Sequence, residues 1–346
     1  MQKTTAAILI DIGKPLVVTE IGVPDLMPGQ VLVDVRYSGV CHTQVLEVRG
    51  HRGEDKYLPH LLGHEGSGVV RDVGAGVTRV QKGDHVILSW IRGPGATVGG
   101  TQYDWDGRAV NAGPITTFSR KTVVSESCVT KVSADFSADL AALVGCAVPT
   151  GVGVVLNTLK VQPGESLAVF GVGGVGLCAI GAAAVAGCNP IIAIDLVPEK
   201  LALARSLGAT HTIDAGAGDV IEGVKATCPV GLDHAVEASG VPAVMRQALL
   251  ALRPRGGKAA IIGNAPHGET IEIDPSQLNL GKQILGTWGG DSEPARDYPR
   301  YCGMMDSGQL DLRPLLSRVY ALEDINDALD DLEAGRVARP MIDMGL

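Results

Sequence analysis

The chain lacks a surplus of basic residues, a long apolar run and a targeting segment. Its 29 lysine and arginine residues are outnumbered by 38 aspartate and glutamate residues, so the formal net charge is −9. Such a chain offers no basic surface to nucleic acid or to an anionic membrane, and we expect neither as a partner. The apolar patch Ala6 to Ile10 is interrupted by Asp11, too early for a signal peptide, and no stretch reaches transmembrane length. These absences predict a cytoplasmic protein.

The cysteines show no pattern of pairing, and aromatic residues are scarce. The seven cysteines are an odd number scattered over 346 residues, which is poor material for a disulfide framework and fits a reducing compartment. Aromatic residues make up 3% of the chain, whereas 45% is hydrophobic and 46 residues are glycine, a composition that suits an α/β protein with many tight turns. The length allows two domains, each with its own core. The sequence contains no internal repeat, low-complexity tract or long linker.

Two hydrophobic patterns divide the chain. From Ile8 to about Val132, short β runs are broken by Gly, Pro and Asp, which is typical of a compact, mostly β domain. From Gly151 onward, strands alternate with helices, which indicates a parallel sheet. The predicted strands are 30–37, 68–73 and 85–88 in the first part and 166–170, 191–195, 210–213, 232–237, 258–263 and 283–287 in the second. Six strands in the second part complete a doubly wound sheet.

Helices are predicted over 177–186, after the first strand of the parallel sheet, and in the tail over 299–306 and 322–334. A short strand is predicted at 341–343. We expect the tail, from about Asp291, to return to the first domain.

The stretch Val169 to Leu177, which reads VFGVGGVGL, joins an apolar strand to a helix. Two of its glycines let the backbone turn sharply and approach a pyrophosphate, and Gly176 allows the helix to pack closely on the strand. The helix N-terminus supplies amide donors and a positive dipole. A glycine run of this kind is often only a turn, so the surrounding pattern has to support it. The residues assigned to a dinucleotide here are Gly171, Gly173, Gly174, Val175 and Gly176.

Asp195 stands 19 positions after Gly176 at the end of a predicted strand, where the ribose-binding acid of a dinucleotide site falls. A carboxylate there repels a 2′-phosphate by about 4 kcal/mol per unit charge at ~4 Å and an effective dielectric near ~20. Lys200 offsets part of that repulsion, but the residue after the acid is Leu196 rather than arginine. We therefore expect NAD to bind better than NADP. The cofactor-binding candidates in this region are Asp195, Lys200 and Ile262.

Three separate segments carry ligands suited to a borderline metal ion, namely Cys41, His64 and Cys146. Two thiolates and one imidazole make a tripod that leaves the fourth position of zinc open, which distinguishes catalytic zinc from closed structural zinc. Each residue alone has a simpler interpretation, because a single buried Cys is usually a small hydrophobe and a single His a satisfied polar group. Spacing alone does not bring the three together.

A resemblance does bring them together. The segments Cys41-His-Thr, Gly63-His-Glu-Gly-Ser-Gly-Val-Val70, Gly83-Asp-His-Val86, Gly145-Cys146 to Thr150-Gly151 and the glycine stretch stand in the order found in zinc-dependent medium-chain alcohol dehydrogenases. The chain resembles this family over nearly its whole length. The resemblance implies an α/β fold, with an N-terminal, mostly β, GroES-like catalytic domain and a Rossmann doubly wound parallel sheet. Residues 1–150 and 291–346 would form the catalytic domain, and residues 151–290 would bind NAD.

The resemblance also implies roles at the reacting centre. Cys41, His64 and Cys146 would hold one catalytic zinc per chain. Glu65 would be a nearby carboxylate able to approach the metal, although a carboxylate that only accepts backbone hydrogen bonds is the simpler alternative. Thr43 would hydrogen-bond the substrate oxygen and begin the proton exit.

Further roles implied by the resemblance concern cofactor and substrate. His42 and Arg339 would contact the pyrophosphate, and Thr150 would lie beside the nicotinamide. His42 is otherwise an exposed loop residue, and a second arginine three positions before Arg339 competes with it. Trp90 and Phe118 would line the substrate pocket, against the alternative that both are ordinary core residues.

The chain departs from the family pattern at several positions. The family's structural zinc uses four clustered cysteines, but residues 91–127 contain none, so we expect that zinc to be absent. A loop rich in glycine and aromatic residues, 93–111, stands in its place. Gln44 replaces the aspartate that orients the zinc-bound histidine, and its uncharged amide oxygen would raise ligand basicity less. Leu46 replaces the histidine that often finishes the proton relay, which leaves the ribose hydroxyl, water or His51.

These observations predict an enzyme that transfers a hydride between an alcohol, or an aldehyde or ketone in reverse, and NAD. The small-molecule substrate is open, and oxidation of hydroxymethyl adducts of a small thiol is one variant. The alternatives are a zinc-free relative that reduces quinones or enoyl double bonds, usually with NADPH, and a non-catalytic NADH-binding protein. The complete tripod and Asp195 favour the first interpretation. The predicted edge strand 283–287 favours a homodimer, and a homotetramer is the other expected assembly.

Overall fold

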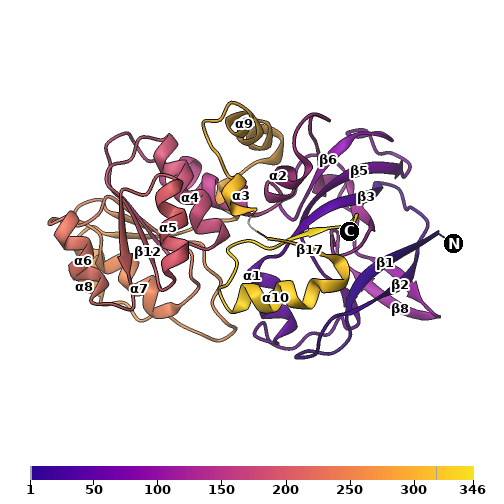
Figure 1. Cartoon of the computed structure of the whole chain (residues 1–346), viewed down its shortest axis with the longest axis horizontal. Helices are drawn as coiled ribbons and strands as arrows, with labels where there is room; N and C mark the ends of the chain where they lie inside the picture. The colour runs from indigo at the N-terminus through magenta and orange to yellow at the C-terminus, as the bar shows by residue number, and fades with distance from the viewer. Residues whose placement is uncertain (1, 317) are drawn as a thin grey trace. The chain divides into compact units, whose positions relative to one another are not determined.

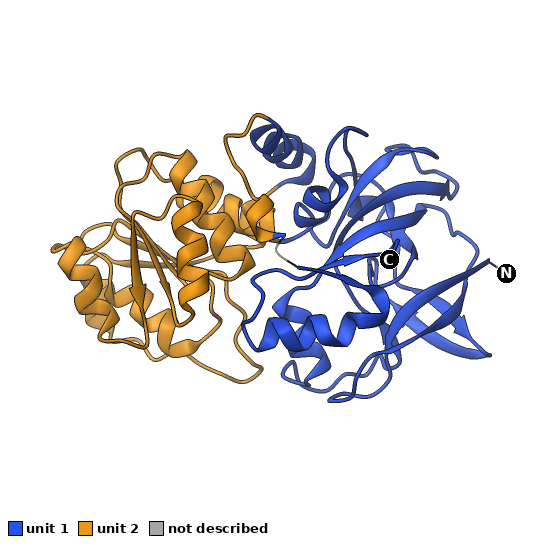
Figure 2. Ribbon diagram, viewed as in Figure 1, with its two compact units in different colours: residues 1–146, 293–306, 316–346 blue, residues 147–292, 307–315 orange. Residues whose placement is uncertain are grey.

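The computed structural model describes residues 2–316 and 318–346, and the chain divides into two compact units (Figures 1 and 2). Unit 1 consists of residues 1–146, 293–306 and 316–346, and unit 2 of residues 147–292 and 307–315. Within the described part of the chain, no helix has both the length and the apolar character needed to cross a bilayer.

Unit 1 contains a closed barrel and a seven-stranded sheet. The barrel consists of β1 (Gln2–Leu9), β2 (Val17–Val23), β7 (Thr101–Trp105), β8 (Arg108–Ala112) and β4 (His60–Leu61), in that order. The sheet follows the order β10 (Val129–Lys131), β6 (His85–Ser89), β5 (Glu65–Val73), β3 (Gln30–Gly39), β18 (Met341–Asp343) and β17 (Val319–Ala321), and β9 (Lys121–Ser125) also pairs with β3. The first unit is therefore mostly β, as the sequence predicts.

Alternating side chains of β3 separate two hydrophobic cores. Val31, Val33 and Val35 lie in the larger cluster, whereas Leu32 lies in the cluster inside the barrel. Successive side chains of a strand point to opposite faces, so one run of apolar residues serves both cores. As a result, β3 is buried along almost its whole length, and the chain continues from it to Cys41.

The helices of unit 1 lie in its connections and its tail. They are α1 (His42–Val48), η1 (Glu126–Cys128), α2 (Ala138–Leu143), α9 (Pro294–Asp306), η5 (Leu322–Asp324) and α10 (Ile325–Glu333). The last strand, β18, pairs antiparallel with β3, with Met341 opposite Gly39. The C-terminus thereby joins strands from the start of the chain in one sheet.

Unit 2 is a six-stranded sheet in which every pairing is parallel. Its order is β13 (His211–Asp214), β12 (Ile191–Asp195), β11 (Leu167–Phe170), β14 (His234–Glu237), β15 (Lys258–Ile261) and β16 (Gln283–Gly286). This is the doubly wound order 3-2-1-4-5-6, which confirms the predicted fold class. The helical segments are α3 (Ala147–Gly153), η2 (Val154–Leu159), α4 (Gly174–Val185), α5 (Pro198–Ser206), α6 (Val220–Thr227), α7 (Pro242–Leu250), α8 (Pro275–Asn279), η3 (Gly289–Asp291) and η4 (Arg313–Leu315).

Part of the segment predicted as a loop, 93–111, is a β-hairpin. β7 and β8 pair antiparallel around Asp106 and Gly107, both of which have positive φ. An Asp-Gly pair between two strands is a strong hairpin signal, because both central positions of that turn require positive φ. The loop prediction was wrong here, because the turn at Asp106 and Gly107 pairs two strands within a glycine-rich segment.

Two predicted helix boundaries also differ from the structure. The helix predicted from residue 299 begins at Pro294, the first of two prolines that could each mark a helix start. The helix predicted over 322–334 consists of the single turn η5 followed by α10.

Candidate metal centre and cofactor site

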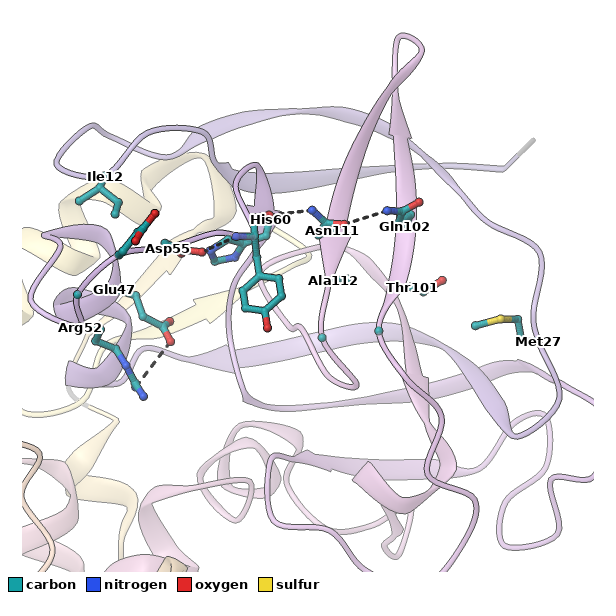
Figure 3. A pocket seen from close by; sticks show the side chains of 15 residues that line it. Ile12, Met27, Glu47, Arg52, Asp55, His60, Thr101, Gln102, Asn111 and Ala112 are labelled. Atoms are coloured by element: carbon teal, nitrogen blue, oxygen red, sulfur yellow. Dashed lines mark hydrogen bonds and ion pairs between the residues drawn. The ribbon is translucent and has the colours of Figure 1, made fainter. Parts of the chain in front are cut away.

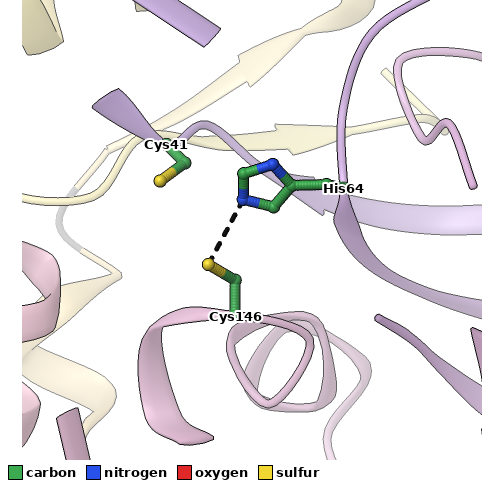
Figure 4. A group of neighbouring side chains, drawn as sticks. All are labelled: Cys41, His64 and Cys146. Carbon is green, nitrogen blue, oxygen red and sulfur yellow. Dashed lines mark hydrogen bonds between the residues drawn. The ribbon is translucent and has the colours of Figure 1, made fainter. Parts of the chain in front are cut away.

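Three side chains from distant parts of the sequence converge in unit 1. Cys41 precedes α1, His64 precedes β5 and Cys146 precedes α3, and their ligand atoms all lie within 4.8 Å of one another (Figure 4). His64 Nε2 is 3.2 Å from Cys146 Sγ. Among residues 2–316 and 318–346, this is the one cluster of His, Cys, Asp or Glu side chains close enough to hold a metal ion.

Close backbone packing holds the Cys146 segment in place. A Cβ atom on Gly145 would lie 2.3 Å from the carbonyl oxygen of Leu88 and 2.7 Å from Glu65 Cβ, so only glycine fits. The Ser89 hydroxyl donates to the Gly145 carbonyl at 2.7 Å and lies 2.6 Å from the Tyr298 hydroxyl. Sequence reasoning did not identify Ser89 or Tyr298, because nothing in the spacing links residue 298 to strand β6.

The two thiols share their ionisation. Hydrogen bonding from the Cys146 thiol lowers the pKa of Cys41 well below its ordinary value, helped by the charge of Arg339. The same contact, together with burial, raises the pKa of Cys146 well above its ordinary value. The pair thus holds one negative charge readily and resists a second, which a bound cation would compensate. A Cys₂His set has the donor chemistry of catalytic zinc, which takes three protein ligands and leaves its fourth position to water or substrate.

Gln44 contacts two members of the cluster. Its side chain is 1% exposed, its Oε1 accepts the backbone N–H of Cys41 at 3.0 Å, and its Nε2 lies 2.6 Å from His64 Nδ1. Gln44 thus contacts the imidazole, but through its amide nitrogen. The expectation that its amide oxygen accepts the hydrogen bond of His64 was wrong, because that oxygen accepts the N–H of Cys41 instead.

A fully buried ion pair borders the cluster. The guanidinium of Arg339 contacts the carboxylate of Glu65, and the two residues are 3% and 0% exposed. Burial raises the pKa of Glu65, and the positive charge of Arg339 opposes that rise. Arg339 Nε has no hydrogen-bond partner among the described residues. The competing residue, Arg336, pairs instead with Asp331 at 2.6 Å.

Of the other residues predicted to act at the reacting centre, some lie beside the ligand cluster and others do not. Thr43 Oγ1 is 3.7 Å from Cys41 Sγ, and the Trp90 ring meets the His64 ring edge-on with centroids 6.4 Å apart. His42 is exposed at the start of α1. Phe118 is 0% exposed and packs in the larger core of unit 1, so its proposed contact with substrate stays a prediction.

A cavity of about 780 Å³ lies between the segment that follows α1 and the β7–β8 hairpin (Figure 3). Charged groups line one side, where Arg52 lies 3.7 Å from Glu47 and Asp55 lies 2.7 Å from His60. Glu54 adds a third carboxylate to the lining. The opposite side carries neutral polar groups, with Gln102 donating to Asn111 at 3.0 Å. Burial raises the pKa of Glu47.

The glycine stretch of unit 2 forms a tight turn between β11 and α4. Gly171 has a φ of +88°, and Gly173 is the N-cap residue of α4 without any side-chain cap. A Cβ on Gly176 would lie 2.1 Å from the Gly171 carbonyl oxygen, whereas a Cβ on Gly173 would meet open space. Gly174 and Val175 form the first turn of the helix. The turn leaves uncapped amides beside an open position, which suits a pyrophosphate.

Asp195 ends β12 and supports this turn. Its carboxylate accepts the backbone N–H of Val172 at 2.8 Å and of Val197 at 3.0 Å. Lys200 is half-buried in α5, and Ile262 follows β15 and donates its N–H to the Glu237 carbonyl at 2.9 Å.

Thr150 lies in α3, and its hydroxyl is buried without a hydrogen-bond partner among the described residues. A buried hydroxyl of this kind is costly unless a ligand or water satisfies it.

A parallel dinucleotide-type sheet in one unit and an open Cys₂His cluster in the other define the class of zinc- and dinucleotide-dependent oxidoreductases. A family model described as "Zinc-binding dehydrogenase" matches residues 174–307, and one described as "Alcohol dehydrogenase GroES-like domain" matches residues 27–134.

Curated relatives and solved structures agree with these matches. The chain is 36% identical to S-(hydroxymethyl)glutathione dehydrogenase of Synechocystis over 367 residues and to the Escherichia coli enzyme of that name over 370 residues, covering 98% of this chain and 99% of each relative. Benzyl alcohol dehydrogenase from Acinetobacter calcoaceticus superposes with a TM-score of 0.90 at 31% identity. An alcohol dehydrogenase zinc-binding domain protein from Burkholderia ambifaria gives 0.88 at 32%, and each structural comparison covers 99% of both chains. The chain belongs to the zinc-binding alcohol dehydrogenase family and is an enzyme, a zinc-dependent oxidoreductase.

Proposed function

We propose that Cys41, His64 and Cys146 hold one zinc ion and that the enzyme transfers a hydride between an alcohol and NAD. The observation that carries this proposal is the convergence of the three ligand atoms within 4.8 Å. When bound, zinc supplies a Lewis acid that makes the hydroxyl group of an alcohol acidic near neutral pH. The complete donor set speaks against a zinc-free reductase.

The residues around the cluster position and deprotonate the substrate. Thr43 Oγ1 accepts a hydrogen bond from the alcohol hydroxyl and passes its proton on to the ribose hydroxyl, to water or to His51. Trp90 limits the space beside the His64 ring and excludes water from it. Glu65 and Arg339 neutralise each other beside the thiolates, so the cluster gains no further net charge.

Unit 2 binds the cofactor in this proposal. The open position at Gly173 and the uncapped amides of α4 receive the pyrophosphate. Both oxygens of Asp195 already accept backbone N–H groups, but each retains an acceptor position for a ribose hydroxyl. Its negative charge disfavours NADP, and Lys200 and Ile262 complete the adenosine side. The unsatisfied hydroxyl of Thr150 is a donor for the nicotinamide. When bound, NAD accepts the hydride from the carbinol carbon.

The charges that line the cavity beside α1 indicate which class of alcohol would fit there. Glu47, which lines it, stands four residues after Thr43 and so occupies the same face of α1 one turn away. Three carboxylates and one guanidinium give the lining a negative balance. We propose an alcohol whose remote part is neutral and hydroxyl-bearing or cationic. The hydroxymethyl adduct of glutathione, suggested by the names of the relatives, is the second candidate, but its carboxylates would meet like charge here.

Metal analysis and a substrate panel test this function. We expect about one zinc per chain, NADH formation with a neutral primary alcohol, and lower kcat/KM for an alcohol carrying a carboxylate at its far end. Cys146→Ala should abolish turnover, while Cys188→Ala, a buried cysteine in unit 2, serves as the control. Normal turnover in Cys146→Ala would refute the metal assignment. A preference for the anionic alcohol or the glutathione adduct would refute only the substrate class.

The proposed assembly is a homodimer or homotetramer. β16 lies at the edge of the parallel sheet, where a second copy can extend it. Light scattering of the purified protein measures the assembly, and a monomer at micromolar concentration contradicts the proposal.

A further inference from the structure

The side chain of Gln44 contacts both the backbone N–H of Cys41 and the imidazole of His64. At one end its Oε1 accepts the N–H of Cys41 at 3.0 Å, and at the other its Nε2 lies 2.6 Å from His64 Nδ1. Gln44 is 1% exposed, so bulk water cannot replace either contact. An amide offers one acceptor oxygen and one donor nitrogen, and here each faces a different partner.

The orientation of the imidazole decides which proton arrangement metal binding requires. His64 Nε2 lies 3.2 Å from Cys146 Sγ, so Nε2 faces the ligand cluster and Nδ1 faces Gln44. A nitrogen that binds a metal carries no proton, so a neutral ring that binds through Nε2 has its hydrogen on Nδ1. In the metal-loaded state, the Nδ1–H of His64 and the N–H of Cys41 would both need an acceptor from Gln44.

One amide cannot accept a hydrogen bond from both His64 and Cys41, because it has a single acceptor oxygen. With Nε2 toward His64, the ring is satisfied only when Nδ1 is an acceptor, which places the proton on Nε2 and blocks the metal. Rotation of the amide by half a turn would serve the ring but would place the NH₂ group against the N–H of Cys41. A carboxylate has acceptors at both ends and would satisfy both donors.

We propose that Gln44 is a positioning residue that stabilises the metal-free tautomer of His64 and thereby weakens zinc binding. The inference rests on the proposed metal centre. Loading then requires either amide rotation or the loss of one buried hydrogen bond. Changes in the partners of metal ligands typically alter affinity by about 10–100-fold, and this is the range expected for replacing the amide by a carboxylate.

The first measurement is zinc affinity by competition with a fluorescent chelator. Gln44→Glu should bind zinc about 10–100-fold more tightly than the wild type. The matched control is Gln30→Glu, because Gln30 is 2% exposed in unit 1 and its Oε1 also accepts a backbone N–H, from Met27 at 2.9 Å. This control introduces a buried carboxylate away from the cluster and should leave zinc affinity unchanged. Equal affinity of wild type and Gln44→Glu overturns the proposal.

The second measurement needs no variant at position 44 and separates hydrogen bonding from the added charge. Two-bond ¹H–¹⁵N spectra of the metal-free wild type at alkaline pH report which ring nitrogen of His64 carries the proton, with His64→Asn used for assignment. We expect the Nε2–H tautomer, and finding Nδ1–H overturns the proposal even if Gln44→Glu fails to fold. If the wild type retains no zinc at any pH, the proposed function fails, whereas a zinc-loaded enzyme with the Nδ1–H tautomer contradicts only the role of Gln44.

Discussion

At the scale of single residues, two glycines of the same turn should fail in different ways when replaced by alanine. In Gly176→Ala the new Cβ would meet the Gly171 carbonyl oxygen at 2.1 Å, a clash with backbone, so we expect loss of stability. In Gly173→Ala the methyl group enters open space, so the fold should persist with only a small loss from the altered helix cap. The same methyl group would occupy the proposed pyrophosphate position, so NADH binding should weaken at least about tenfold, or 1.4 kcal/mol.

Thermal denaturation and NADH fluorescence titration distinguish these outcomes. Gly303→Ala is the control, because its Cβ also meets open space and it lies inside α9 of unit 1. Alanine in a helix interior is favoured over glycine by roughly 0.5–1 kcal/mol, so this variant should be as stable as the wild type or more stable. If Gly173→Ala binds NADH normally, the pyrophosphate lies elsewhere.

Asp195 carries a second prediction at this scale. Asp195→Asn keeps an acceptor for one of the two backbone N–H groups that the carboxylate serves, but removes the charge that opposes a 2′-phosphate. We expect the ratio of kcat/KM for NADP to that for NAD to rise at least about tenfold. A tenfold change corresponds to about 1.4 kcal/mol, which is below the ~4 kcal/mol upper range for repulsion between a carboxylate and a 2′-phosphate. Asp214→Asn, at the end of the neighbouring strand in register with Asp195, is the matched control. A cofactor ratio that is the same in all three proteins would contradict the assignment.

The role of a residue could be predicted where a short sequence pattern identifies it. The glycine turn and Asp195 lie within one βαβ unit, so spacing along the chain was sufficient. The Cys41, His64 and Cys146 cluster needed a family resemblance, because its members meet through strand pairings that the sequence does not specify. Tyr298 could not be predicted at all, since its contact with Ser89 depends on where the tail packs.

At the scale of elements, hydrogen bonds to η1 and to the residue before it hold the segment from Ala96 to Val98. Glu126 accepts the backbone N–H of Ala96 at 2.8 Å and the N–H groups of Thr78 and Arg79 at 2.6 and 2.8 Å. Ser125 accepts the N–H of Val98 at 3.0 Å. One carboxylate thus joins two loops.

We expect Glu126→Gln to lower the free energy of unfolding by about 1–3 kcal/mol, because a buried charge-assisted acceptor is lost. Despite the opposing effect of burial, the backbone hydrogen bonds hold the pKa of Glu126 below its ordinary value. Its stabilisation is therefore complete above the unfolded-state pKa of about 4.3 and is lost as pH falls through the lower folded-state value. The difference between wild type and variant should accordingly shrink as pH falls below about 4. Urea denaturation at neutral and acidic pH measures it, and a difference that widens in acid contradicts the role.

The hairpin β7–β8 shows why this region was the hardest to predict from sequence. In β7, polar or charged residues flank Tyr103 and Trp105, so the alternation of apolar side chains is short. The decisive signal was the turn at Asp106 and Gly107, not the composition around it. The parallel strands of unit 2 were predicted to within a few residues. Apolar runs buried on both faces mark the central strands β11, β12 and β14, whereas the edge strands β13 and β16 are only partly buried.

At the scale of the whole molecule, the two proposed ligands belong to different units. All three metal-ligand residues lie in unit 1, while the glycine turn and Asp195 lie in unit 2. Each unit has its own hydrophobic core. A ligand that binds only the folded state stabilises it by about 2.7 kcal/mol at a concentration of 100 times its Kd. Zinc and NADH should therefore protect separate parts of the chain.

Hydrogen exchange with mass spectrometry tests this division directly. Removing zinc with a chelator should speed exchange in the peptides around Cys41, His64 and Cys146, because the three ligands then lose the cation that joins them. Adding NADH to the zinc-free protein should slow exchange in peptides covering 171–177, whose amides are uncapped at the start of α4. Restoring zinc should reverse the first effect. If chelation speeds exchange at 171–177 and leaves the three ligand segments unchanged, the metal does not bind where the sulfur and imidazole ligands meet.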